Sequence, residues 1–358
     1  MDRAREAAEG AMERAREAAE GAVDVVGREE MERLVGLPRA LAIVGPTASG
    51  KSRLALWLAE RLGLPVLCCD SVQVYRGLDI GSAKADAALR ERVPHRLIDL
   101  VAPDEGFSAG DYAIAAAREL GAGPGLVAGG TGFYLRAAAY THSGDEVGDA
   151  DEHGRAAFTA QWEAREREAP GSVHAALAER DPVTAAEIHP RNVVRAVRAL
   201  WLCEAHGQPV SRVRAVDPPR ARVALALVVL DPPAPLLGPA IDARCDAMMR
   251  AGFLAEVEML REAGYSARHK SMRSLGYRQL DSFLDGHGDL AAAVAAIKAE
   301  TRSYARRQRT YFRHQLAGEA VALRVTVAAP LWEPAVDLSR ETDPWLARVE
   351  AFLSGVSA

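Results

Sequence analysis

The chain has 358 residues, of which 49% are hydrophobic and 26% charged, and its formal net charge at pH 7 is −5. No apolar run approaches the length of a membrane span and the first residues lack a signal-peptide core, so membrane-spanning and secreted proteins are excluded. The four cysteines, Cys68, Cys69, Cys203 and Cys245, show neither metal-ligand nor disulfide spacing. We therefore expect a cytoplasmic enzyme of one large domain or two, with buried free thiols.

The N-terminus contains an internal repeat. The segment RAREAAEGA at 3–11 recurs at 14–22, and no large apolar residue follows until Val23. Ala, Arg and Glu favour a helix, but this one has nothing to bury. We expect residues 1–35 to be an N-terminal extension, either a frayed helix or disordered.

From Ala40 onward, buried strands alternate with helices. Apolar runs at 40–44, 65–69 and 125–130 predict strands, and the amphipathic segment that ends at Leu62 predicts a helix between the first two. This alternation predicts an α/β fold, a P-loop NTPase-like parallel sheet with helices on both faces. Its ligand site should lie at the carboxyl ends of the strands.

The middle of the chain changes character. Residues 141–215 are rich in Ala, Arg and Glu, and their helical periodicity is broken by Pro170, Pro182 and Pro190. We expect a helical insertion domain with helices over 153–168, 172–179 and 191–206. A strand over 222–230 resumes the core, followed by helices over 239–263, 274–284 and 290–316 and a short strand near 320–327. The core then comprises 36–140 and 216–330, and 331–358 is a C-terminal tail.

The first strand leads into a phosphate-binding motif. Gly45-Pro46-Thr47-Ala48-Ser49-Gly50-Lys51-Ser52 fits G-x-x-x-x-G-K-[ST] in full, between a predicted strand and a predicted helix. The glycines let backbone N–H groups wrap a di- or triphosphate at a helix N-terminus. Lys51 supplies a positive charge, and the Ser52 hydroxyl suits Mg²⁺.

Two polar residues follow the next strands. Asp70 ends the second strand, where a carboxylate can orient Mg²⁺ or take a proton from a nucleophile; an Asp that caps a helix or a turn is the less favoured alternative. Gly129-Gly130-Thr131 follows the third strand, where the glycines allow close approach of a ligand and Thr131 adds a hydroxyl. Both residues are candidates for the reacting centre.

Basic residues concentrate near the C-terminus. Residues 268–313 carry ten Lys/Arg against four Asp/Glu. Five of them fall at spacings of 4, 4, 3 and 4 on one predicted helix: Lys298, Arg302, Arg306, Arg309 and Arg313. This basic stripe suits a phosphate backbone. The alternative is a solvated face whose cations are balanced by neighbouring acids. Only Glu300 is acidic nearby in the sequence, which counts against that alternative.

Several blocks together resemble the tRNA dimethylallyltransferase (isopentenyltransferase) family. They are GPTASGKS, DSVQVYRGLDIGSAK, VPHRLIDL, GGTGFYLRA, IHPRNVVRAVRAL, RCDAMMRAGFLAEVEML, SMRSLGYRQL and ETRSYARRQRTYFR, in this order from about Leu41 to Arg313. The resemblance implies transfer of a dimethylallyl group from dimethylallyl diphosphate to N6 of the adenosine at tRNA position 37, next to the anticodon. The products are N6-isopentenyladenosine and diphosphate.

The resemblance also implies residue roles. Asp70 is the base on the adenine amine and Thr131 assists it, with Mg²⁺ as cofactor. The diphosphate is held by Gly45, Pro46, Thr47, Ala48, Ser49, Gly50, Lys51, Ser52 and Arg244. The anticodon stem-loop is contacted by the insertion and by Asp70, Ser71, Val72, Gln73, Thr131, Arg155, Arg195, Arg198, Arg273, Gly276, Tyr277, Arg278, Arg306, Arg307, Gln308 and Arg313. The adenine must flip out of its stack, and Tyr277, Tyr311 and Phe312 either stack on bases or pack in the core.

Three alternatives remain. An adenylate isopentenyltransferase acting on free AMP would share the fold, but it would need neither the insertion nor the basic stripe. A P-loop small-molecule kinase would share GPTASGKS, but it would also carry an Arg-rich lid, and we find no segment in the sequence that fits one. A non-catalytic RNA-binding protein would have little use for Lys51 beside Asp70. We expect a monomer with no membrane association.

Overall fold

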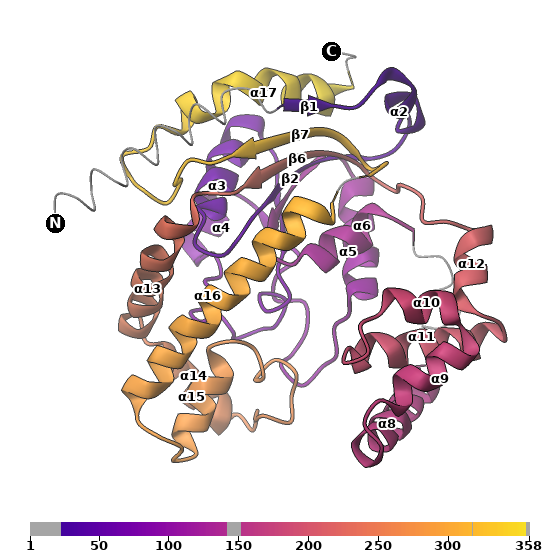
Figure 1. The fold of residues 1–358 in the computed structure, drawn as a ribbon. Coiled ribbons are helices and arrows are strands. Elements are labelled where there is room, and N and C mark those ends of the chain that lie inside the picture. The colour runs from indigo at the N-terminus through magenta and orange to yellow at the C-terminus, as the bar shows by residue number, and fades with distance from the viewer. Residues whose placement is uncertain (1–22, 142–151, 317, 356–358) are drawn as a thin grey trace. The chain divides into compact units, whose positions relative to one another are not determined.

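The computed structural model describes residues 23–141, 152–316 and 318–355. The chain forms two compact units (Figure 1). The first combines the chain up to Ala139 with the chain from Ala221 onward, and the second is Tyr140–Arg220. The repeat at 3–22 lies outside the described residues.

A mostly parallel seven-stranded sheet forms the centre of the first unit. Its strand order is β1-β7-β6-β2-β5-β3-β4, and only β1 runs antiparallel to its neighbour. The strands are β1 (Val23–Val25), β2 (Arg39–Val44), β3 (Val66–Cys69), β4 (His95–Arg96), β5 (Gly125–Gly129), β6 (Ala224–Leu230) and β7 (Val321–Val327). The four strands expected from apolar runs up to residue 230 are β2, β3, β5 and β6, and the short strand expected near 320–327 is β7.

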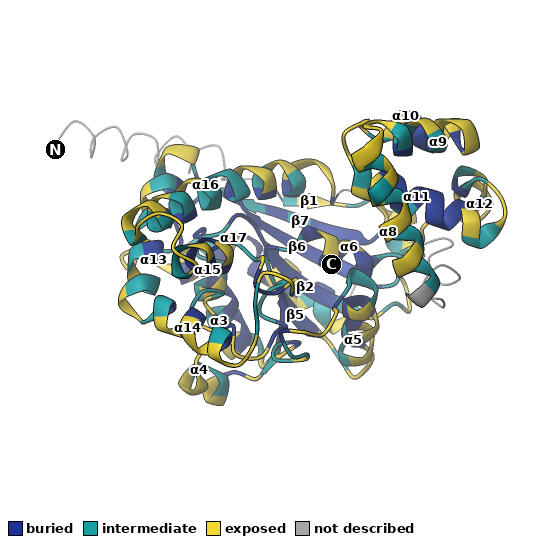
Figure 2. Cartoon of the chain, turned by 90° about the horizontal axis from the view of Figure 1, so that it is seen from below, coloured by how far each residue is buried: buried dark blue, intermediate teal, exposed yellow. Residues whose placement is uncertain are grey.

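Helices cover both faces of the sheet, so its central strands are buried on both sides. Leu41 and Ile43 of β2 belong to a core cluster with Leu54 of α3 (Lys51–Leu62) and Val349 of α17 (Leu338–Ser354). The alternate residue Ala42 is also fully buried, so the opposite face is covered too. Figure 2 shows the central strands in dark blue. Figure 1 shows α16 (Leu290–His314) crossing in front of them, with α5 (Ala109–Gly121) and α6 (Gly132–Ala139) to its right.

The first unit contains five further helices among the described residues. They are α2 (Arg28–Arg33), α4 (Ala87–Arg92), α13 (Ala234–Arg250), α14 (Phe253–Glu262) and α15 (Tyr277–Leu284). The single helix expected over 239–263 is wrong, because α13 and α14 are separate. Gly252 breaks them with φ of 101°, a left-handed conformation that favours glycine.

The second unit is helical. It contains α8 (Glu152–Glu168), α9 (Ser172–Arg180), α10 (Pro182–Glu187), α11 (Val193–His206) and α12 (Val210–Val216). Its own core includes Val173, Leu177 and Leu200. The sequence pattern did not indicate α10 and α12, which are short. Asp181 caps α10 by accepting a hydrogen bond from Thr184 N at 3.1 Å.

The expected N-terminal extension is too long. Val23, Asp24 and Val25 pair with Val325, Arg324 and Leu323 of β7, so this segment is part of the sheet. Leu34, just after α2, is 3% exposed and belongs to the main core cluster. Residues 23–35 are therefore integral to the first unit, because β1 gives β7 its second hydrogen-bonded neighbour.

The expected C-terminal tail is also wrong. Helix α17 buries Trp345, Leu346 and Val349 against the sheet. Arg53 of α3 donates hydrogen bonds to the carbonyl oxygens of Leu331 and Val336, both at 2.9 Å. This segment is thus fixed to the helix that follows the phosphate-binding motif.

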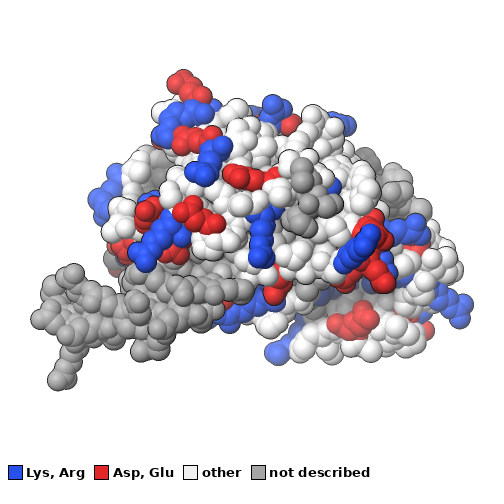
Figure 3. All heavy atoms as spheres, turned by 90° about the horizontal axis from the view of Figure 1, so that it is seen from above, with Lys and Arg blue, Asp and Glu red and all other residues white. Residues whose placement is uncertain are grey.

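On the face seen from above, basic and acidic side chains are interspersed (Figure 3).

All four cysteines are buried and free, as the sequence predicted. Among the described residues, no helix combines the length and apolar character needed to span a membrane.

Candidate active site

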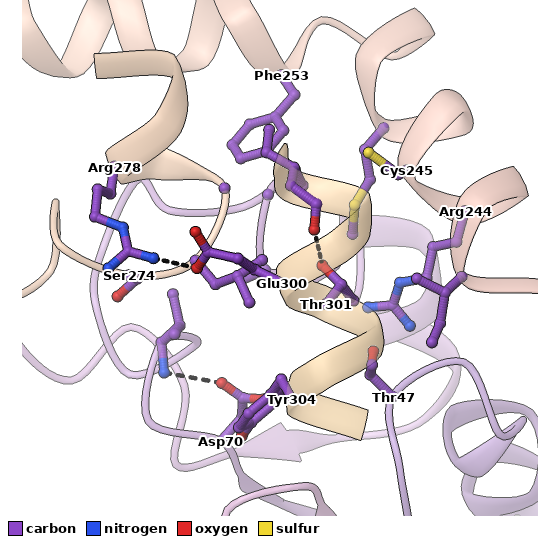
Figure 4. Close-up of a pocket in the computed structure, with 18 of the residues that line it drawn as sticks. Thr47, Asp70, Arg244, Cys245, Phe253, Ser274, Arg278, Glu300, Thr301 and Tyr304 are labelled. Carbon is purple, nitrogen blue, oxygen red and sulfur yellow. Dashed lines mark hydrogen bonds and ion pairs between the residues drawn. The ribbon is translucent and has the colours of Figure 1, made fainter. Parts of the chain in front are cut away.

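A cavity of about 360 Å³ opens beside the carboxyl ends of β2 and β3. Figure 4 shows Thr47 and Arg244 on its right-hand side, Asp70 and Tyr304 below, and Arg278 on the left. Ile241, Cys245, Met248, Phe253, Leu275 and Ile297 supply apolar lining. The cavity therefore brings a phosphate-binding loop, a carboxylate and an apolar wall together.

The loop Gly45–Ser52 joins β2 to α3, as the motif requires. Gly50 is the N-cap residue of α3 with φ of 90°, and a Cβ there would lie 2.6 Å from the carbonyl carbon of Leu331. Glycine is therefore needed both for its backbone conformation and for space. The Thr47 N–H donates to the Gln308 side chain at 2.8 Å. Ser52 is exposed at the first turn of α3.

Lys51 is poised between two charges. Its Nζ donates to the Pro46 carbonyl at 2.6 Å. Burial, together with the nearby Arg244 guanidinium, lowers the pKa of Lys51 to about 7, and Asp70 opposes this shift. Burial also lowers the pKa of Arg244, again against the effect of Asp70. Two cations held together near one carboxylate form a site for a strongly anionic group.

Asp70 sits at the end of β3 with its carboxylate inside a turn. Its Oδ1 accepts from Val72 N at 2.8 Å and from Gln73 N at 3.3 Å. Asp70, Ser71 and Val72 all line the cavity. The turn role and the cavity position coexist, because Oδ1 binds the backbone while the residue still borders the cavity.

Thr131 is tied to the same turn. Its Oγ1 accepts from Ser71 N at 3.0 Å, which fixes the hydroxyl next to Asp70. Tyr304 of α16 lies close to both residues. Burial and the Asp70 charge raise the pKa of Tyr304, and a hydrogen bond with Thr131 opposes that rise. Tyr304 therefore remains a neutral hydrogen-bonding phenol beside Asp70 and Thr131.

Part of the predicted RNA-contact set lies around the cavity. Arg273, Gly276, Arg278 and Arg307 line it, together with Ser71 and Val72. Arg278 forms an ion pair with Glu300. Arg307 stacks over the Tyr304 ring, with its guanidinium carbon 5.7 Å from the ring centroid. Three arginines of the predicted RNA-contact set, together with Arg244, thus border the cavity that Asp70 faces.

Comparison with known proteins decides the family. The family model described as IPP transferase matches residues 73–315, and the one described as isopentenyl transferase matches 38–96. The tRNA dimethylallyltransferase of Roseiflexus castenholzii is 44% identical over 278 residues, which are 76% of this chain and 89% of that protein. The chain belongs to the IPP transferase family.

Other relatives and solved structures agree. The tRNA dimethylallyltransferase 1 of Trichlorobacter lovleyi is 40% identical over 295 residues, 80% of this chain and 94% of that protein. The full-length tRNA isopentenylpyrophosphate transferase from Bacillus halodurans is 29% identical with a TM-score of 0.58, covering 89% of this chain and 97% of that one. A eukaryotic dimethylallyltransferase acting on tRNA has a TM-score of 0.72 at 21% identity, covers 89% and 80%, and supports the fold.

Three residues that the family resemblance assigned to RNA are used inside this IPP transferase. Tyr277 is fully buried, and its hydroxyl donates to Glu256 Oε1 at 2.7 Å. Gln308 is 5% exposed. The amide of Gln73 donates to Ser82 O at 2.9 Å and accepts from Cys68 Sγ at 2.8 Å. Burial argues against Tyr277 and Gln308 as RNA contacts, whereas the assignment of Gln73, which is half-buried, stays a prediction.

The three aromatic residues expected either to stack on bases or to pack in the core also differ in burial. Phe312 is 1% exposed, so Tyr277 and Phe312 pack in the core. Tyr311 is half-buried, and its hydroxyl donates to Gly132 O at 3.1 Å.

The basic stripe is largely neutralised within this IPP transferase. Lys298 pairs with Asp246 at 2.6 Å, Arg302 pairs with Asp242, and both carboxylates belong to α13. Arg309 and Arg313 both pair with Asp231, at 2.7 and 2.6 Å. The expectation that these cations are free for RNA is therefore wrong for four of the five. Arg306 is exposed and forms no ion pair in the part of the chain that the structure describes.

The other predicted arginines belong to the second unit. Arg155 lies on α8, and Arg195 and Arg198 lie on α11 at a spacing of three. Arg195 is exposed, whereas Arg155 and Arg198 are half-buried.

The residues present fit a magnesium ion that the ligand itself helps to hold. Among the described residues, no three His, Cys, Asp or Glu side chains cluster in a way that could bind a metal without other ligands. Mg²⁺ bound to phosphates normally needs only one or two protein groups. Ser52, exposed on the first turn of α3, can supply one. The donor set therefore suits a metal–diphosphate complex rather than a protein-only metal site.

Sequence reasoning missed Tyr304 at the site and Asp231, which pairs with two arginines of α16. Tyr304 precedes Arg307 and Gln308 by three and four positions, so helical spacing alone places all three near one face of α16. Asp231 directly follows the apolar run of β6, at the end of the strand beside β2. No local pattern indicated that Asp231 would collect two arginines from α16, because they follow it by 78 and 82 residues.

Proposed function

We propose that this chain transfers the dimethylallyl group of dimethylallyl diphosphate to N6 of the adenosine at tRNA position 37, next to the anticodon. The observation that carries the proposal is one cavity bordered by Thr47 of the phosphate-binding loop, by Arg244 and by Asp70. Its apolar lining suits a five-carbon prenyl group, and its volume of about 360 Å³ is within the usual range of small-molecule sites. The named relatives act on tRNA.

The donor end of the reaction is assigned to Gly45–Ser52 and Arg244. Backbone N–H groups of the loop, Lys51 and Arg244 neutralise the diphosphate, which makes it a better leaving group. Mg²⁺, held by Ser52 and the diphosphate, would supply further charge neutralisation. The bond between the first prenyl carbon and the diphosphate oxygen breaks, and both electrons leave with the oxygen.

The acceptor end is assigned to Asp70 and Thr131. The adenine N6 forms a bond to the same prenyl carbon and then carries an excess proton, which Asp70 accepts. Oδ1 of Asp70 is held by two backbone N–H groups, so Oδ2 is the oxygen that faces the amine. The Thr131 hydroxyl, fixed by Ser71 N, orients the amine beside it.

RNA recognition is assigned to Arg273, Arg278, Arg306 and Arg307, with Arg155, Arg195 and Arg198 of the second unit. Arg273, Arg278 and Arg307 line the cavity that a flipped adenine would enter. We also propose that the chain acts as a monomer in the cytoplasm, where its four buried free thiols are kept reduced.

Two acceptors and two donors test the proposal. The protein is incubated with unmodified tRNA or AMP, and with dimethylallyl diphosphate or ATP, and all products are analysed. We expect prenylated tRNA from dimethylallyl diphosphate alone, without consumption of ATP. Prenylation of AMP in preference to tRNA would establish the free-nucleotide enzyme, and phosphate transfer from ATP would establish a kinase.

A further inference from the structure

One buried glutamine joins the phosphate-binding loop to the loop that follows β5. Gln308 Oε1 accepts from Thr47 N at 2.8 Å, and Gln308 Nε2 donates to Gly130 O at 2.9 Å. The residue is 5% exposed, so both polar ends of its amide are satisfied away from solvent. Removing the amide would leave a donor and an acceptor of the two loops without partners.

The same connection continues to the reacting residues. Gly130 directly precedes Thr131, and Thr131 Oγ1 accepts from Ser71 N, the residue after Asp70. The Tyr311 hydroxyl, one turn further along α16, donates to Gly132 O at 3.1 Å. A path of hydrogen bonds, with one peptide link from Gly130 to Thr131, therefore runs from the phosphate-binding loop through Gln308 to the Asp70 turn.

Gly130 is shaped to receive this side chain. A Cβ on Gly130 would lie 2.2 Å from Gln308 Nε2, whereas the next backbone atom it meets, Gly45 O, is 3.9 Å away. Any side chain at Gly130 would therefore displace the Gln308 amide before it disturbed the backbone. Space at position 130 is thus a condition for the bridge.

We propose that Gln308 is a positioning residue, which sets the separation between the loop Gly45–Ser52 and the Asp70–Thr131 pair. The inference rests on the proposed function. Transfer requires the prenyl carbon, held through its diphosphate, to meet an adenine nitrogen held by Asp70 and Thr131. A misplacement of about 1 Å between such groups costs about 10²-fold in rate. RNA affinity should not depend on Gln308, because its amide does not reach the surface.

The first test is Gln308→Met, which keeps the length of the side chain and removes both hydrogen bonds. Single-turnover rates are measured at saturating donor and tRNA, and the tRNA Kd is measured without donor. We expect the rate to fall about 10- to 100-fold, with the tRNA Kd within about threefold of the parent. Gln315→Met is the matched control, because Gln315 is exposed at the end of the same helix. It should react at the parent rate.

The second test breaks the bridge from its other end. Gly130→Ala should displace the Gln308 amide and lower the rate, while in a Gln308→Ala background it should cost little more. It also decides the matter if Gln308→Met does not fold. Near-parent rates for both single variants would overturn the inference, as would a weakened tRNA Kd with an unchanged saturated rate. Absence of transfer by the parent would instead refute the proposed function.

Discussion

Arg313 of α16 is held by Asp231, the residue that follows β6, with Nη2 2.6 Å from Oδ2. Arg309 binds the other carboxylate oxygen at 2.7 Å, so one carboxylate pairs with two cations of the basic stripe. A charge that is already paired contributes little to the attraction of a polyanion. RNA affinity should therefore depend on the unpaired cations of α16 rather than on the stripe as a whole.

Substitution of Arg306 and Arg307 together by Gln should weaken tRNA binding and flatten its salt dependence. If each makes one phosphate contact, the slope of log Kd against log salt should fall by about 1.4–1.8. Arg313→Gln, the control, should leave the slope near that of the parent and cost stability instead. Kd values at several salt concentrations measure these slopes. A larger change for Arg313→Gln than for the double variant would show that the basic stripe as a whole binds RNA.

Asp70→Asn should slow the chemical step and leave tRNA affinity almost unchanged. Asn retains the Oδ1 that accepts from Val72 N and Gln73 N, so the turn is preserved and only the base is lost. A general base typically contributes about 10²–10⁴-fold. Single-turnover rates at saturation decide it, and a near-parent rate would reduce Asp70 to a turn residue.

Donor affinity should fall as pH rises above 7. In the protein without donor, the pKa of Lys51 is lowered to about 7, so above that pH the lysine must take up a proton to bind the diphosphate. The donor Kd should rise about tenfold per pH unit until the pKa of the complex is reached. Lys51→Met should bind weakly and lose this dependence. Calorimetry in two buffers measures the proton uptake, and none at pH 8 would contradict the assignment.

The same lysine affects folding with a defined sign. Between pH 7 and its ordinary value of 10.5, the unfolded chain binds more protons at this position than the folded chain. Its contribution to the free energy of unfolding therefore increases with pH across that window. The effect should be absent from Lys51→Met.

Two truncations test the N-terminal boundary. Removal of residues 1–22 deletes a repeat with no apolar face and should leave the melting temperature essentially unchanged. Removal of residues 1–30 also deletes β1, which pairs with β7, and Val23 and Val26, which pack against the main core. We expect about 1–3 kcal/mol less stability. Equal melting temperatures for both truncations would show that β1 contributes nothing.

The apolar runs and glycines made the core of the fold predictable. Strands β2, β3, β5 and β6 are mainly buried apolar runs, and such runs in a parallel sheet are visible in a single sequence. The edges were not. Strand β1 has only three residues, and its pairing with β7 depends on a contact about 300 positions away along the chain. Helix α17 is amphipathic, but nothing local indicated the sheet face that it covers.

The site divides along similar lines. Lys51 and Asp70 follow strands, so the fold alone predicts that they meet. The partners of α16 do not follow from its own sequence, because Asp231, Asp242 and Asp246 come from other elements. Spacing identified which side chains share a helix face. It could not identify that this face is turned toward α13 and the end of β6 rather than toward solvent.

The measurement that tests the central claim most directly is nucleoside mass analysis of tRNA after incubation with isotopically labelled dimethylallyl diphosphate. Fragments around the anticodon are isolated before digestion, so that the modified position is known. The account predicts labelled N6-isopentenyladenosine at the adenosine next to the anticodon, formed without ATP and nearly abolished by Asp70→Asn. Label on any other nucleotide, or no label in tRNA while AMP is prenylated, would contradict it.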